Sequence, residues 1–174
     1  MLFFKANNKA KAKIENRYKA ITIVILLLVI AAISERIYHD FFGQRNADHS
    51  YIGLLLVLFL SINLLYYIFI IQSKKFNRII QSIEIGDDTF KVITFSFNIK
   101  YFPFELKAIE FEMKKGNVIC KELKLDLRSI IDNLPFANSF ALKYNNKDYY
   151  LVPSLFDEKE KVIEAVTSGI KYEV

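Results

Sequence analysis

Residues 51–72 form an uninterrupted run without a charged side chain, and most of its positions hold Ile, Leu, Val or Phe. A helix of this length rises roughly 33 Å, which exceeds the hydrocarbon thickness of a bilayer, about 30 Å. The insertion of so many apolar side chains outweighs the cost of the single amide of Asn63. The pattern therefore predicts a transmembrane helix over residues 51–72.

A second apolar run covers residues 20–34 and is shorter. Tyr18 and Lys19 extend it, because an aromatic ring and a snorkelling ammonium group are favourable at headgroup level. We therefore predict a first transmembrane helix over residues 18–38. Together with the second helix it would form a helical hairpin over residues 18–73.

The alternative interpretation of the first run is a cleaved signal peptide. Ala32-Ile33-Ser34 resembles the small-residue site at which signal peptides are cut, and cleavage there would remove residues 1–34. The basic segment before the apolar run is long for a signal peptide, so we favour a retained transmembrane helix.

Basic residues near the two spans predict the orientation of the chain. Residues 1–17 are basic, whereas the loop between the spans carries only two arginines. Since Lys and Arg near a span favour the cytoplasmic side, both termini are predicted to be cytoplasmic, in a bacterial inner membrane. The side chains expected at the membrane interface are those of Lys19, Lys74, Lys75 and Arg78.

The formal net charge of +5 belongs mostly to the membrane anchor. Basic and acidic residues nearly balance after residue 74, which argues against a nucleic-acid partner because that class needs a basic face on the folded domain. The basic cluster is explained by attraction to anionic lipid heads or by orientation signalling alone.

The hydrophobic period changes from that of a helix to that of a strand after the second span, so residues 76–174 are predicted to form a cytoplasmic β-rich domain. Gly86-Asp87-Asp88, Lys114-Lys115-Gly116-Asn117 and Asn145-Asn146-Lys147 are predicted turns between strands. The six predicted strands cover residues 79–85, 89–97, 109–113, 122–128, 140–144 and 149–152.

The C-terminal segment has the pattern of an amphipathic helix over residues 157–170. Asp157 and Glu160 have the spacing of a capping box, in which two side chains accept hydrogen bonds from free amide groups of the first turn. Apolar side chains on one face would close the helix over the sheet. These side chains are Val162, Ile163, Val166 and Ile170.

The order of hairpins followed by one helix resembles that of a pleckstrin-homology-like (PH-like) domain. The strongest local likeness covers Phe140–Val166, where a hairpin leads through Tyr149-Tyr150-Leu151-Val152-Pro153 into the helix. Bacterial PH-like domains that follow two N-terminal spans have this layout. The resemblance implies an α+β membrane protein: a transmembrane hairpin, then an antiparallel β-barrel or sandwich capped by a C-terminal helix, with a binding or scaffold role. The family's barrel has seven strands, and this sequence predicts six.

The same layout also resembles the two-span, β-rich effectors of bacterial cyclic-nucleotide antiphage defence. That resemblance implies a nucleotide second messenger bound to the β-rich domain and helices that disrupt the membrane. The C-terminal helix favours the PH-like interpretation, and the shared order of elements keeps the effector as the alternative.

Residue types that carry enzyme chemistry are present but badly placed for it. Both histidines lie in the predicted outward loop, as His39-Asp40 and Asp48-His49, which is a weak candidate for a zinc site. They lie across the membrane from the β-rich domain, so Cys120 and the serines of that domain have no histidine as a base. Glu110 and Glu112 alternate onto a solvated strand face, and no two glycines have phosphate-loop spacing. We predict a protein with no catalytic site, no metal and no cofactor.

Two polar residues inside the second span are candidates for contacts between helices. Ser61 and Asn63 can hydrogen-bond across a helix interface within the bilayer. Pairing with the first helix of the same chain is favoured, and self-association or a protein partner is the alternative. The bilayer itself is the other expected partner.

Overall fold

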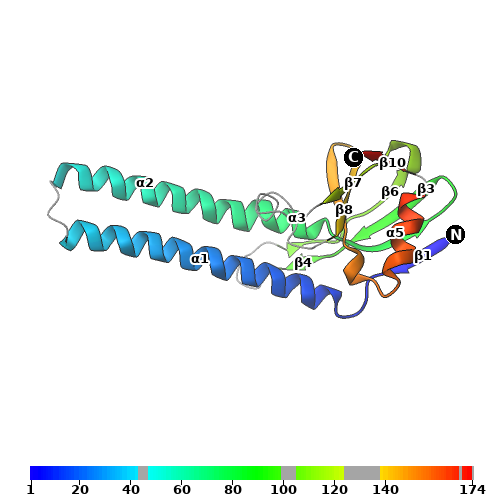
Figure 1. Cartoon of the computed structure of the whole chain (residues 1–174), viewed down its shortest axis with the longest axis horizontal. Coiled ribbons are helices and arrows are strands. Elements are labelled where there is room, and N and C mark those ends of the chain that lie inside the picture. The colour runs from blue at the N-terminus through cyan, green and yellow to red at the C-terminus, as the bar shows by residue number, and fades with distance from the viewer. Residues whose placement is uncertain (43–46, 99–104, 124–137, 169, 174) are drawn as a thin grey trace. The chain divides into compact units, whose positions relative to one another are not determined.

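The computed structural model describes residues 1–42, 47–98, 105–123, 138–168 and 170–173. It divides into two compact units, each with its own internal contacts. The helical unit contains Asn16–Ser73, and the β unit contains Met1–Glu15 together with Lys74–Val174. The two units are described separately below, with the element labels of Figure 1.

The helical unit consists of two long helices that run side by side (Figure 1). Helix α1 covers Ala10–Phe42, and α2 covers Ala47–Tyr66. A π-helical segment, η1, continues α2 over Tyr67–Gln72. The short helix α3 (Ser73–Asn77) follows and belongs, from Lys74 on, to the β unit. No proline interrupts these segments, and Leu, Lys, Arg and Ala favour helix.

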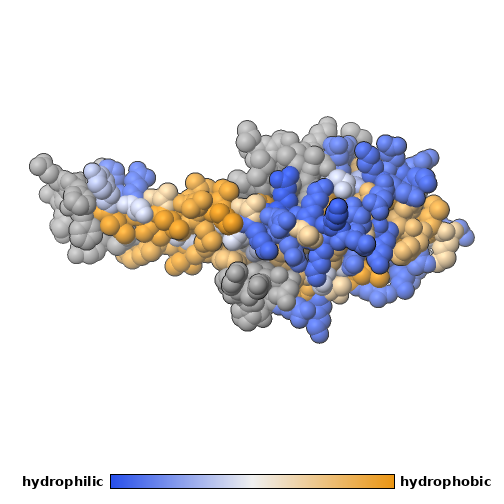
Figure 2. Space-filling model, turned by 90° about the horizontal axis from the view of Figure 1, so that it is seen from below, coloured by the Kyte–Doolittle hydropathy of each residue, from blue (hydrophilic) through white to orange (hydrophobic). Residues whose placement is uncertain are grey.

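Both long helices are long and apolar enough to cross a membrane, over Ala10–His39 and Leu55–Asn77. The structure thus contains the two apolar helices predicted over 18–38 and 51–72. In their most apolar stretches only 6% and 12% of the residues are buried within the protein. Figure 2 shows an apolar surface along the helical unit. The exposed apolar side chains of the two helices include Ile23, Leu27, Leu28, Ile30, Leu55, Leu56, Phe59, Leu60 and Ile62.

The first sheet of the β unit has the strand order β1-β2-β3-β6, all antiparallel. Its strands cover Leu2–Lys5, Ile80–Ile85, Thr89–Thr94 and Glu110–Lys114. The predicted hairpin around Gly86-Asp87-Asp88 is present between β2 and β3. Apolar side chains of alternate positions face the core, where Ile83, Phe90 and Met113 are fully buried.

The second sheet has the order β10-β7-β8-β9. Its strands cover Lys171–Glu173, Ile119–Leu123, Ser139–Tyr144 and Lys147–Leu151, and β10 lies parallel to β7. The predicted turn between β8 and β9 is confirmed, because Asn145 and Asn146 have φ angles of 49° and 58°. Asparagine tolerates this left-handed conformation better than most residues.

Short elements complete the β unit. Strands β4 (Phe97–Asn98) and β5 (Glu105–Leu106) form a two-stranded ladder, and η2 (Lys115–Asn117) is the turn predicted between β6 and β7. The segment η3 (Pro153–Leu155) leads to helix α5 (Lys159–Thr167), which buries Val162 and Val166 completely.

The strands do not form the closed barrel expected for a PH-like domain. Among the described residues they form two separate four-stranded sheets and one two-stranded ladder. One backbone bridge, between Ile79 and Tyr150, links the two larger sheets. The predicted strand over residues 122–128 is observed only as far as Leu123, and the rest of it lies outside the described residues.

The N-terminus differs from the expected division of the chain. Residues 1–17 were expected to form a basic tail outside the domain, and instead Leu2–Lys5 pairs with β2 while Ala6 bridges Phe156. The side chains of Phe4 and Ala6 are buried. The domain therefore begins at the N-terminus and continues at residue 74, rather than beginning at residue 76.

The C-terminal helix is shorter than the predicted 157–170. Its N-cap is Glu158 rather than Asp157, and the side chain of Glu158 makes no capping hydrogen bond, so the predicted capping box is wrong. Val162 and Val166 pack in the core and so determine which face of the helix is buried. This packing outweighs the preference of Asp157 for the N-cap position. Strand β10 follows the helix and was not predicted.

Candidate functional site

The residues predicted at the membrane interface have different surroundings. Lys19 and Lys74 are exposed, whereas Lys75 and Arg78 are half-buried. The Arg78 carbonyl accepts a hydrogen bond from the Tyr150 amide, at 3.0 Å. Arg78 therefore has a structural role in the β unit, besides any role at a lipid surface.

The pKa of the Tyr149 hydroxyl is raised above its ordinary value of 10.0. Burial raises this pKa most, the positive charge of Arg78 lowers it, and Tyr144 raises it. The phenol of Tyr149 therefore stays protonated at neutral pH.

Ser61 and Asn63, the predicted helix-contact residues, differ from each other. Ser61 is buried within the helical unit, whereas Asn63 is exposed. The Asn63 amide nitrogen donates to the Phe59 carbonyl one turn earlier, at 2.8 Å. The Asn63 amide is thus satisfied within its own helix, and contact between helices through Ser61 stays a prediction.

Gly53 and Arg36 mark a close contact between the two long helices. A side chain added at Gly53 would collide with the Arg36 guanidinium. The missing side chain at Gly53 therefore gives the Arg36 guanidinium room to lie against the backbone of α2.

The loop with the candidate zinc ligands is only partly described. His39 lies near the Tyr38 ring, with ring centroids 6.0 Å apart and an edge-to-face angle of 74°. The side chains of Asp40, Asp48 and His49 lie outside the described residues. Within the described part of the chain, no group of three or more His, Cys, Asp or Glu side chains is arranged to hold a metal.

Cys120 is fully buried in β7, where it pairs with Leu142 of β8. Burial, with a smaller contribution from the charge of Glu122, raises the pKa of its thiol from 9.0 to about 11. A reactive cysteine needs a lowered pKa and access to solvent. Cys120 has neither, which agrees with the predicted packing role.

We expect folded Cys120 to react with iodoacetamide about a hundredfold more slowly than the unfolded chain at pH 8.5, because the thiolate is the reactive form. Above pH 9 the unfolded thiol ionises, while the folded one stays protonated until about pH 11, so stability falls with rising pH across this window. Mass spectrometry of labelled protein measures the rates, and Cys120→Ala should remove the thiol's part of the pH dependence. Equal rates in the folded and unfolded protein would contradict the burial.

Sequence reasoning missed Asn77, which lies at the end of α3 and is buried. Its amide nitrogen lies near three backbone carbonyls, those of Phe95 at 2.8 Å, Lys107 at 3.1 Å and Leu106 at 3.4 Å. These carbonyls belong to the segments that flank β4 and β5. Asn77 thus fastens helix α3 to the β4–β5 ladder, and nothing in the local sequence reveals these long-range bonds.

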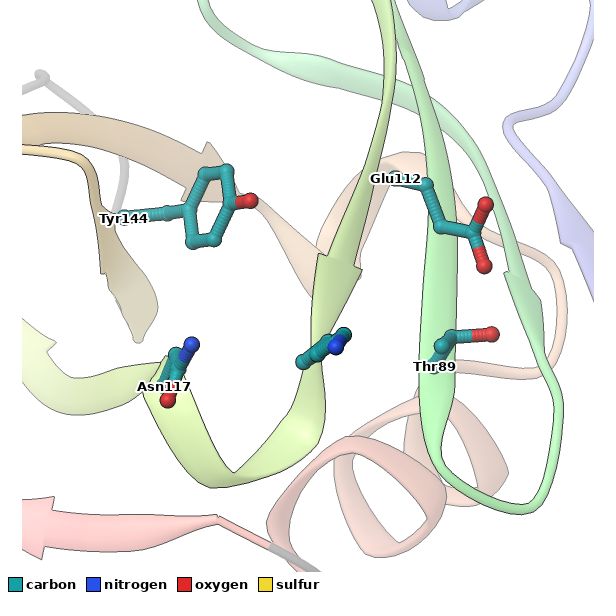
Figure 3. Close-up of a pocket in the computed structure, with 5 residues that line it drawn as sticks. Thr89, Glu112, Asn117 and Tyr144 are labelled. Carbon is teal, nitrogen blue, oxygen red and sulfur yellow. The ribbon is translucent and has the colours of Figure 1, made fainter.

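A pocket of about 360 Å³ lies on the β unit, open to solvent, and we call it the β6 pocket. Side chains from both large sheets and the turn between them line it. Figure 3 shows Tyr144 and Asn117 on one side and Glu112 with Thr89 on the other. The complete lining is Thr89 of β3, Glu112 and Lys114 of β6, Asn117 of η2 and Tyr144 of β8.

An aromatic cluster supports the wall of the β6 pocket. The Phe111 ring stacks on the Tyr144 ring with centroids 6.1 Å apart and planes at 17°. The same Phe111 ring contacts Tyr149 at 4.2 Å. The position of the Tyr144 ring is therefore held by packing on β6 and β9.

The sequence singled out Glu110 and Glu112 as a carboxylate pair, and the structure separates their roles. Glu110 forms an ion pair with Lys91 at 3.1 Å, with both side chains more than half exposed. Glu110 is the main cause of a raised pKa for Lys91, with smaller effects from Glu84 and Glu112. Glu112 lines the β6 pocket and acts there as the negatively charged group.

Gly86 and Gly116, the described glycines of the β unit, lie in two separate turns. A side chain added at Gly116 would meet no atom within 4 Å, and one at Gly86 would make ordinary contacts with Thr89. Both residues occupy turns, as predicted, and Gly169 lies outside the described residues. No family model, curated protein or solved structure matches this chain, so its function has to be argued from this geometry.

Proposed function

We propose that the chain is a non-enzymatic binding protein anchored in a bacterial inner membrane by two transmembrane helices. The observation that carries this proposal is the exposure of apolar side chains along both long helices, in a chain whose β unit has its own buried core. A soluble protein rarely leaves so large a continuous apolar surface in water. A bilayer accepts such helices, because their backbone groups are already hydrogen-bonded.

The order of the elements supports a PH-like identity for the β unit. Strands β2, β3 and β6 form one antiparallel group, β7, β8 and β9 form a second, and α5 follows. Strands β1 and β10 extend the two sheets beyond the expected pattern. We propose that this unit presents a binding surface for a protein partner at the cytoplasmic face, where the basic residues near the spans would place it.

Strand β1 supports retention of the N-terminal segment. Cleavage after residue 34 would remove β1, whose four residues pair with β2, and would leave the β2 edge unpaired. An open strand edge is a template for aggregation. We therefore propose that the first apolar helix remains in the mature protein.

The β6 pocket favours a binding role over a nucleotide-gated effector. Its lining holds one carboxylate, Glu112, and one ammonium group, Lys114. A cyclic nucleotide carries phosphates but no ammonium group, so it would leave the Glu112 carboxylate facing negative charge, whereas proteins that hold multiple phosphates use clusters of cations. A thermal-shift panel of cyclic nucleotides tests this directly, and stabilisation by one of them would reverse our preference.

Membrane insertion is tested by fractionation of cells that express the full chain. We expect the protein to stay in the membrane pellet after alkaline carbonate and to enter solution with detergent. Leu58→Arg combined with Leu60→Arg should abolish insertion, since each arginine costs about 2.5–3.5 kcal/mol in the centre of a span. Leu2→Arg is the matched control, because Leu2 is exposed on β1 of the β unit.

Orientation is tested in the same cells. Protease added to inverted vesicles should digest the β unit, and protease added to spheroplasts should leave it intact. Release of the unmodified chain by carbonate would refute the membrane anchor, and protection of the β unit in inverted vesicles would reverse the orientation.

A further inference from the structure

We propose that the β6 pocket binds a small zwitterion that carries an ammonium group and a phosphate, the chemistry of phosphoethanolamine. The lining side chains come from four separate elements that fold together at the edge strand β6 (Figure 3). The volume of about 360 Å³ lies at the lower end of the range for small-molecule sites, roughly 300–1,000 Å³. This inference goes beyond the proposed function and does not depend on membrane insertion.

The two charges of the pocket determine the class of ligand. Glu112 and Lys114 are two residues apart on β6, so their Cα atoms lie about 7 Å apart on one face of the strand. Among the described residues they form no ion pair with each other. A pure anion would be repelled by Glu112 and a pure cation by Lys114. A ligand with both charges satisfies each of them.

The hydrogen-bonding groups decide between the possible acidic groups of the ligand. Three lining side chains other than Glu112 and the neighbouring Thr89 can donate hydrogen bonds to an acidic group: the Lys114 ammonium, the Asn117 amide and the Tyr144 hydroxyl. Glu112 is the acceptor-only group. This excess of donors fits a phosphate monoester, which offers three strong acceptor oxygens, better than a carboxylate, which offers two. The Glu112 carboxylate then remains for the ammonium group.

The pocket is also held in place before a ligand binds. Phe111 packs against the rings of Tyr144 and Tyr149, which fixes the Tyr144 wall. Thr89 and Lys114 are cross-strand partners in the β3–β6 register. A site on rigid strands binds with a smaller entropy cost than a site on loops.

The test uses full-length protein in a detergent without phosphate groups, titrated by calorimetry. We expect saturable binding of phosphoethanolamine, and binding of ethyl phosphate and of ethanolamine at least about tenfold weaker, because each lacks one charge-assisted contact. Glycerophosphoethanolamine, a diester with two unesterified phosphate oxygens, should bind more weakly than the monoester, which indicates a soluble ligand. Binding tighter than that of the monoester would overturn the choice of a monoester and indicate a lipid headgroup.

Variants separate the two charges. Glu112→Gln should weaken phosphoethanolamine about tenfold and remove its advantage over ethyl phosphate, whereas Lys114→Gln should weaken both phosphates. Glu122→Gln and Lys121→Gln are matched controls on β7, exposed and outside the pocket, and should change neither. The proposal is overturned if phosphoethanolamine does not bind saturably, if ethyl phosphate binds equally well, or if Glu112→Gln and Lys114→Gln leave its affinity unchanged.

Discussion

We expect Asn77→Asp, which replaces the side-chain NH2 group by an oxygen atom, to destabilise the β unit strongly. The new carboxylate would lie in the buried site near the carbonyl oxygens of Phe95, Leu106 and Lys107, at 2.8 to 3.4 Å from the present amide nitrogen. Three acceptors would then face a negative charge with no donor between them. We expect a loss of about 3 kcal/mol or more at neutral pH, which lowers the melting temperature by more than about 10 °C.

The loss of stability caused by Asn77→Asp should increase with pH. The carbonyls disfavour the charged form, so the folded-state pKa of the new carboxyl group should rise above its unfolded value of about 3.9. Below pH 3.9 the group is protonated in both states and the additional loss is absent. As pH rises through the folded-state pKa the loss grows and then levels off.

Thermal unfolding of the full chain in detergent, followed by circular dichroism at pH 4 and pH 7, measures the difference from the wild type. Asn77→Ala should cost about 1–3 kcal/mol with no such pH dependence. Asn8→Asp is a control, because Asn8 is exposed and an acidic group is tolerated there. If Asn77→Asp behaved like Asn77→Ala at both pH values, the contact of Asn77 with the three carbonyls would be wrong.

The sequence predicted those helices and hairpins whose formation depends on residues close together in the chain. The uncharged run over 51–72 predicts a helix because its length and apolar character can be read from one continuous segment, without knowledge of distant contacts. The hairpins β2–β3 and β8–β9 follow from period-2 alternation next to turn residues, and the asparagines at 145 and 146 adopt the conformation that their side chains tolerate.

The features that the sequence did not predict depend on contacts between distant segments. Leu2–Lys5 is four residues long and has no turn signal beside it, and it becomes a strand only because β2 offers a free edge. The role of Asn77 depends on the carbonyls of Phe95, Leu106 and Lys107, which are at least 18 positions away in the sequence. The β6 pocket likewise requires residues from four elements, and Glu112 alone looks like an ordinary solvated charge.

The pairing of β1 with β2 predicts that two adjacent phenylalanines of β1 contribute very differently to the stability of the β unit. Phe4 faces the core and is 8% exposed, whereas Phe3 is 63% exposed on the opposite face of the same strand. Phe4→Ala should destabilise the β unit by about 3 kcal/mol, because it removes a buried ring and leaves a cavity against β2. Phe3→Ala should change the stability by no more than about 0.5 kcal/mol.

Urea unfolding of the two variants, with tyrosine fluorescence as the signal, measures the difference in one experiment. The composition, charge and strand propensity change equally in both variants, so they form a matched pair. Deletion of residues 2–6 should cost more than Phe4→Ala, since it also removes the backbone pairing with β2 and the bridge from Ala6 to Phe156. If Phe3→Ala and Phe4→Ala had equal effects, the N-terminal segment would be the basic tail that the charge pattern predicts, because a segment outside the sheet buries neither ring.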